Sequence, residues 1–166
     1  MDKLLRQKVS LKNPQHFFAL GMGSGLIPLM PGTFGSLAAI PFLIAMAFMP
    51  VSIFVVVTLL SIVIGIYICD KTAVDMGVHD HGSIVWDEIA GMFVTFLFVP
   101  INWKSLLIGF ILFRLFDILK PWPIRLFDKK VDGGLGIMLD DVVAGLLACV
   151  IMQGLIQSPI TEKFFV

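Results

Sequence analysis

Long apolar runs alternate along the chain with short clusters of charged residues and glycines. A helix that crosses the hydrocarbon core of a bilayer needs about 20 residues, with a range near 17–25. Four runs approach this length, at residues 51–69, 84–100, 103–119 and 140–157. A fifth run, residues 35–49, is shorter and contains Pro41. The pattern predicts an all-α membrane bundle of about five transmembrane helices, or of four with a re-entrant or interfacial segment at the start.

The composition agrees with a membrane protein. Of the 166 residues, 58% are hydrophobic and 14% are charged, whereas a soluble domain has about 45–50% and about 25%. A chain this short keeps much of its surface exposed and cannot bury this excess in a core. We expect one integral-membrane domain over residues 1–166, with a cytoplasmic segment at 1–15 and a tail at 155–166. The net charge of zero argues against a nucleic-acid partner, which needs a basic face.

The lysines and arginines indicate the orientation of the bundle. Basic residues concentrate in the cytoplasmic loops of membrane proteins, and four of them precede the first apolar run. With the amino terminus in the cytoplasm, ten of the twelve basic residues lie on the cytoplasmic side and only Lys104 and Lys163 lie outside. Five spans then place the carboxyl terminus outside.

This topology brings the unusual polar clusters to one side of the membrane. Asp87 and Glu88 begin the third span, residues 114–120 end the fourth, and Asp140 and Asp141 begin the fifth. One acidic residue at a helix end is most simply a residue that ends the span in headgroup water. Charges at the edge of the hydrocarbon core usually face a bundle interior or an aqueous cavity, and their convergence on one side favours a functional site.

Two of these helix starts share a pattern. Residues 87–91 read Asp-Glu-Ile-Ala-Gly and residues 141–145 read Asp-Val-Val-Ala-Gly. In each, the carboxylate is followed at positions i+3 and i+4 by alanine and glycine on the same helical face. Because small residues let a second helix approach closely, we expect each carboxylate to face an interhelical gap one turn from a close contact.

The acidic residues of this face need a cation, because they cannot all stay ionised together without one. They are Asp87, Glu88, Asp117, Asp140 and Asp141. Carboxylate oxygens suit Mg²⁺, which proteins often bind together with substrate phosphates. Arg114, Lys120 and Arg125 offer cationic donors for the same phosphate. Carboxylates, a metal and basic groups together are the equipment of phosphoryl transfer.

Four segments resemble those of bacterial phosphatidylglycerophosphatase A. They are PGTFGSLAAIP (31–41), HDHGSIVWDEIAG (79–91), FRLFDILKPWPI (113–124) and GGLGIMLDDVVAG (133–145), and the resemblance runs from about residue 13 to residue 145. It implies a Mg²⁺-dependent phosphatase of the bacterial inner membrane. Such an enzyme hydrolyses phosphatidylglycerophosphate to phosphatidylglycerol and phosphate, the last step in the synthesis of that lipid, at the cytoplasmic face.

The residues and the resemblance together give a site hypothesis. Mg²⁺ is expected on Asp87, Glu88, Asp140 and Asp141, with Asp117 as a further ligand or as the group that activates water. Lys120, Arg114 and Arg125 are expected to bind the phosphate. The glycine-rich segments at 21–25, 31–36 and 133–136 can aim N–H groups at an anion, although such stretches are more often turns or close packing contacts. Gly23, Gly32 and Thr33 are therefore expected as weaker phosphate contacts.

Alternatives remain open at this point. Attack by water is preferred, but an aspartyl-phosphate intermediate fits the same residues. An ion-coupled transporter also uses intramembrane carboxylates, normally near the bilayer midplane. A lipid-headgroup transferase would share the carboxylates, but the Asp-Gly-x2-Ala-Arg motif does not occur. The expected partners are the phospholipid substrate and membrane lipids, with no protein partner.

Overall fold

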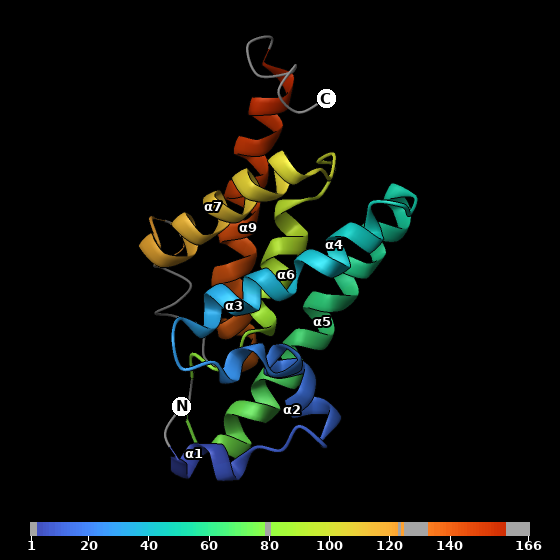
Figure 1. The fold of residues 1–166 in the computed structure, drawn as a ribbon. Coiled ribbons are helices and arrows are strands. Elements are labelled where there is room, and N and C mark those ends of the chain that lie inside the picture. Colours follow the sequence, from blue (N-terminus) through green and yellow to red (C-terminus); the bar gives the residue numbers. More distant parts are fainter. Residues whose placement is uncertain (1–2, 79–80, 123, 125–132, 159–166) are drawn as a thin grey trace.

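The computed structural model describes residues 3–78, 81–122, 124 and 133–158, and every regular element in these ranges is a helix (Figure 1). This confirms the all-α class for the described residues. The elements are α1 (Lys3–Lys8), α2 (Pro14–Ala19), the 3-10 helix η1 (Gly21–Leu26), α3 (Pro31–Ala38), α4 (Ile40–Met46), α5 (Val51–Met76), α6 (Trp86–Thr95), α7 (Trp103–Leu119) and α9 (Gly133–Gln157).

Two of these helices, α5 with 26 residues and α9 with 25, are long and apolar enough to cross a membrane. The expected five transmembrane helices are not confirmed. The predicted run 103–119 coincides with α7, but the run 84–100 forms only the ten residues of α6, too short to cross alone. Phe98, with φ 60°, and Pro100 prevent α6 from continuing.

Two other predicted boundaries also differ from the structure. The run 35–49 divides into α3 and α4 next to Pro41, which lacks the N–H that a continuous helix needs. Conversely, α5 continues through Asp70 and Asp75 and ends only at Gly77, whose left-handed backbone (φ 73°) closes the helix. Charged residues at the end of an apolar run therefore mark the edge of the predicted span and not the end of the helix.

Helix α6 lies at the centre of the bundle, where it packs against α3, α5, α7 and α9 (Figure 1). All its residues from 87 to 95 are buried. Helices α6 and α9 lie side by side and approach each other closely at Gly91 and Gly145. A Cβ atom on Gly145 would lie 2.5 Å from the carbonyl oxygen of Gly91. The predicted close approach of a second helix at each Ala-Gly pattern is confirmed, and the structure shows in addition that the two patterns contact each other.

Helix α5 presents an apolar face to the surroundings. Leu59, Leu60, Val63 and Ile64 are each about half exposed or more, and contiguous apolar surface of this kind marks contact with a membrane or a partner. Together with the length of α5 and α9, this face indicates membrane association.

Candidate active site

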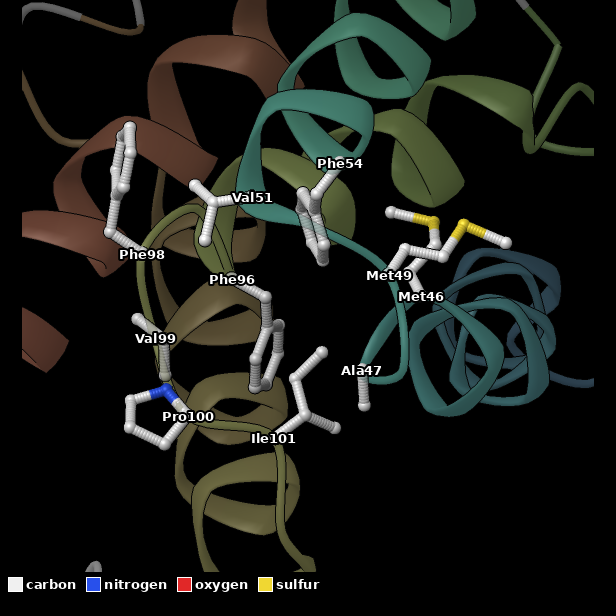
Figure 2. Close-up of a pocket in the computed structure, with 10 residues that line it drawn as sticks. All are labelled: Met46, Ala47, Met49, Val51, Phe54, Phe96, Phe98, Val99, Pro100 and Ile101. Atoms are coloured by element: carbon white, nitrogen blue, oxygen red, sulfur yellow. The ribbon is translucent and has the colours of Figure 1, made fainter.

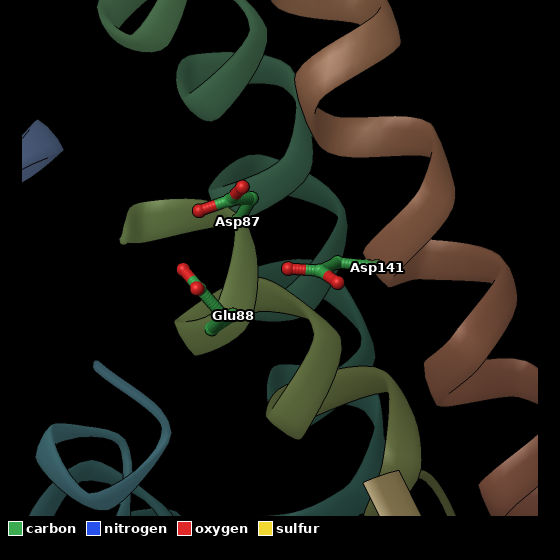
Figure 3. A group of neighbouring side chains, drawn as sticks. All are labelled: Asp87, Glu88 and Asp141. Carbon is green, nitrogen blue, oxygen red and sulfur yellow. The ribbon is translucent and has the colours of Figure 1, made fainter. Parts of the chain in front are cut away.

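Three carboxylates meet where the first turn of α6 faces α9. Asp87 and Glu88 project from α6 and Asp141 from α9, toward one another (Figure 3), with one oxygen of each within 4.8 Å of the others. All three side chains are buried. The crossing at Gly91 and Gly145 explains the meeting, because each aspartate lies four residues, about one helical turn, before the glycine of its own helix. We call these three residues the carboxylate cluster.

The carboxylate cluster needs a compensating positive charge. Buried carboxylates at this separation repel one another strongly, because the surroundings screen their charges far less than water does. The first turn of α6 stabilises Asp87 and Glu88 in part, since helix N-termini favour negative charge. The Oε2 atom of Glu88 accepts no hydrogen bond from any described residue. Buried oxygen donors with unused lone pairs fit a hard cation such as Mg²⁺.

Two basic side chains lie near the carboxylate cluster, Arg114 in α7 and Lys120 directly after its last residue, and each is paired with an aspartate. Arg114 Nη1 donates to Asp117 Oδ2 one turn further along α7. Lys120 Nζ donates to Asp140 Oδ2 at 2.5 Å. Asp140 therefore faces Lys120 and is not a member of the cluster, although it precedes Asp141 directly. Asp117 lies close enough to affect both Glu88 and Asp141 electrostatically.

The first turn of α3 covers one side of the carboxylate cluster. A Cβ atom on Gly32 would lie 2.4 Å from Glu88 Oε1 and 3.1 Å from Arg114 Nη1. Only a glycine lets the α3 backbone approach these two groups so closely. Thr33, the next residue, lies in the same turn and is partly exposed.

Other expected site residues are not among those that the structure places at the carboxylate cluster. The described atom nearest to a Cβ built on Gly23 is Leu11 Cδ1, at 3.8 Å, so the structure does not place Gly23 beside the carboxylates. Arg125 lies outside the described residues. The expected anion-binding loop at 133–136 is instead the first turn of α9, and the N–H of Gly134 donates to Asp70 Oδ1 at 2.8 Å.

The glycine-rich amino-terminal segment has the packing role that is more common for such stretches, and the structure shows which residues it packs against. Cβ atoms on Gly21, Gly25 and Gly35 would each lie within 3.1 Å of Val85 or Ser83. These glycines thus hold the segment that leads into α6, and with it Asp87 and Glu88. The contact of Asp70 with the start of α9 was not predicted, because nothing in the sequence relates Asp70 to Gly134, 64 residues away.

A cavity of about 450 Å³ lies at the opposite end of α6, between the α4–α5 turn and the α6–α7 connection (Figure 2). Its lining consists of apolar residues such as Phe54, Phe96 and Ile101, with no ionisable side chain among them. The cavity therefore lacks the groups for acid–base or phosphoryl chemistry, which gather at the carboxylate cluster.

Comparisons with known proteins identify the family of this chain. A family model described as phosphatidylglycerophosphatase A matches residues 17–156. Phosphatidylglycerophosphatase A of Escherichia coli (strain K12) is 53% identical over 148 residues, which cover 89% of this chain and 86% of the relative. The protein of the same name from Haemophilus influenzae is 51% identical over 148 residues, covering 88% and 91%.

A third relative has a different name. This protein from Bacteroides thetaiotaomicron, provisionally named a phosphatidylinositol-3-phosphatase, is 36% identical over 140 residues, covering 80% of this chain and 87% of the relative. No solved structure matches the chain. The family model and the two relatives of the same name together cover the helices that carry the carboxylate cluster, and the chain belongs to the phosphatidylglycerophosphatase A family of lipid phosphatases.

Proposed function

We propose that the protein hydrolyses phosphatidylglycerophosphate to phosphatidylglycerol and inorganic phosphate with the help of Mg²⁺. The observation that carries the proposal is the carboxylate cluster of Asp87, Glu88 and Asp141, buried beside Arg114 and bordered by Lys120. The two relatives named phosphatidylglycerophosphatase A support the choice of substrate.

Asp87, Glu88 and Asp141 are the residues that would hold Mg²⁺. A bound Mg²⁺ supplies positive charge that offsets these carboxylates and polarises the phosphoryl oxygens. The sequence predicts Asp140 as a fourth ligand. In the structure it is better suited to hold the Lys120 side chain in place, because its Oδ2 accepts a hydrogen bond from Lys120 Nζ at 2.5 Å.

Arg114 is positioned to bind the phosphomonoester. Its guanidinium lies against Gly32 and next to Glu88, and its ion pair with Asp117 fixes its orientation. A planar guanidinium can donate two hydrogen bonds to one phosphate. The close approach of Gly32 to both Glu88 and Arg114 holds this guanidinium beside the carboxylate cluster.

The reaction replaces one phosphorus–oxygen bond by another. The oxygen of a water molecule forms the new bond to phosphorus, and a carboxylate oxygen of Asp117 accepts the proton of that water. The bond between phosphorus and the terminal glycerol oxygen breaks, and this oxygen takes up a proton from solvent. A covalent aspartyl-phosphate is the alternative route, which acid quenching of the enzyme with labelled substrate distinguishes.

The test is phosphate release from phosphatidylglycerophosphate by the detergent-purified protein, with Mg²⁺ and then with EDTA. We expect release only with Mg²⁺, and a loss of about 100-fold or more in Asp87→Asn and Asp141→Asn, because each removes a ligand charge. Asp75→Asn is the matched control, since Asp75 pairs with His16 and Lys71 away from the cluster. Release that survives EDTA, or near-normal activity of Asp141→Asn, contradicts the assignment.

We further propose that the protein is a multi-pass protein of the bacterial inner membrane and that its carboxylate cluster faces the cytoplasm. Lys8 Nζ donates to Met76 O at the end of α5, so the basic amino-terminal segment lies at the same end as the start of α9. Basic segments favour the cytoplasmic side. In the variant Lys12→Cys, at an exposed position, a membrane-impermeant thiol reagent should label the new thiol only in opened cells, and labelling in intact cells contradicts this orientation.

A further inference from the structure

We propose that Lys120 binds the phosphodiester of the substrate while Arg114 binds the phosphomonoester that is cleaved. The proposal rests on the function given above. Phosphatidylglycerophosphate carries two phosphates, a diester that joins diacylglycerol to the headgroup and a monoester at the far end of the headgroup glycerol. Two separate cationic subsites would make the enzyme select lipids that carry both.

Arg114 and Lys120 lie near the same end of α7 but belong to different ion pairs. Arg114 pairs with Asp117 of its own helix, whereas Lys120 pairs with Asp140 of α9. Arg114 lies five positions before Leu119, the last residue of α7, which corresponds to about 7.5 Å along the helix axis, and Lys120 follows directly with a left-handed backbone. A three-carbon glycerol separates the two phosphates of the substrate by several ångströms, a distance of the same order as this spacing.

The two basic groups also differ in their surroundings. Arg114 is 15% exposed and lies beside Glu88 of the carboxylate cluster. Lys120 is 29% exposed, and its partner Asp140 lies outside the cluster. Arg114 is thus placed at the reacting phosphate, and Lys120 at a second position nearer the surface.

The neighbours of Lys120 indicate a lipid interface. Leu119 is 61% exposed and Trp122 is 79% exposed, on either side of Lys120 in the sequence. Exposed tryptophan is typical of the membrane–water interface, where a lysine keeps its stem among apolar groups and its ammonium among headgroups. The diester phosphate of a phospholipid lies at this depth.

The names of the relatives fit a requirement for two phosphates. Phosphatidylglycerophosphate and a phosphatidylinositol 3-phosphate differ in the headgroup, yet each has one diester and one monoester. Phosphatidic acid has the monoester alone, and phosphatidylglycerol has the diester alone. These two lipids therefore separate the two subsites.

The experiment compares kcat/KM for phosphatidylglycerophosphate and phosphatidic acid with identical acyl chains. We expect Lys120→Gln to lower kcat/KM for phosphatidylglycerophosphate about 10- to 100-fold more than for phosphatidic acid, because only the former loses a charge-assisted hydrogen bond. Arg114→Gln should lower both values to the same extent. Lys120→Arg should restore most of the preference for phosphatidylglycerophosphate over phosphatidic acid. The control is Lys71→Gln, which should leave this preference unchanged, because Lys71 pairs with Asp75.

A second measurement is independent of turnover and guards against misfolding. Native mass spectrometry with phosphatidylglycerol and uncharged diacylglycerol should show that Lys120→Gln weakens binding of the former only. The double variant Lys120→Gln/Asp140→Asn also removes the charge of the carboxylate that pairs with Lys120 and should show the same loss. The proposal is overturned if Lys120→Gln lowers kcat/KM equally for phosphatidylglycerophosphate and phosphatidic acid, or if it leaves the binding of phosphatidylglycerol unchanged. If the wild-type protein hydrolyses neither lipid, the proposed function fails, and the binding result alone decides whether Lys120 binds a diester.

Discussion

At the scale of single residues, two neighbouring aspartates have different partners. Asp141 faces Asp87 and Glu88, whereas Asp140 accepts from Lys120. Successive side chains of an α-helix point about 100° apart, so adjacent carboxylates at a helix crossing are directed to different neighbours. The sequence predicted both aspartates as site residues. Only the tertiary structure shows that Asp140 contacts Lys120, at the end of α7, while Asp141 contacts the residues of α6.

Gly32 gives the sharpest prediction at this scale. In Gly32→Ala the new Cβ atom would lie 2.4 Å from Glu88 Oε1 and within 3.3 Å of both Arg114 Nη atoms. Shifts of about 1 Å in groups that position a substrate can cost about 100-fold in rate. We expect a loss of this order in phosphate release, measured beside the melting temperature to show that the variant folds.

Gly154→Ala is the matched control for Gly32→Ala, because nothing lies within 4 Å of a Cβ at residue 154. It should keep wild-type activity. Normal activity in Gly32→Ala would show that α3 does not approach the cluster as described.

At the scale of secondary-structure elements, the crossing of α6 and α9 brings the carboxylates together. Gly145→Ala would place a Cβ atom 2.5 Å from Gly91 O and 3.1 Å from Val94 Cβ. Overpacking of this kind typically destabilises a fold by about 1–3 kcal/mol. We expect a lower melting temperature in detergent. We also expect weaker Mg²⁺-dependent phosphate release, because the new Cβ atom pushes the two helices apart and with them the carboxylates that they carry.

Gly154→Ala, on the same helix but in open space, controls for the change in helix propensity. If both alanine variants melt alike, the Gly91–Gly145 contact does not limit the stability of the bundle.

At the scale of the whole molecule, the carboxylate cluster links stability to metal binding. Like charges brought together in the buried cluster oppose folding, and a cation that binds only the folded state stabilises it by about 2.7 kcal/mol at a concentration of 100 Kd. For a chain of this size we expect Mg²⁺ to raise the melting temperature by about 5–10 °C. EDTA should reverse the shift.

The increase in melting temperature with Mg²⁺ should be lost in Asp87→Asn, which removes one charge of the cluster. It should be kept in Asp75→Asn, because Asp75 pairs with His16 and Lys71 and is not part of the cluster. An equal increase in wild type and Asp87→Asn would place the bound metal at another site.

The sequence by itself determined the all-α class, the extent of α7, and the two Ala-Gly patterns that let α6 and α9 meet. These features follow from local spacing, because apolar length and residue size act within one helix. Only the tertiary structure decided the rest: Asp140 pairs with Lys120, and glycines of the amino-terminal segment pack on Val85. Each of these depends on contacts between segments far apart in the chain, and no pattern within one segment specifies which distant segment it will contact.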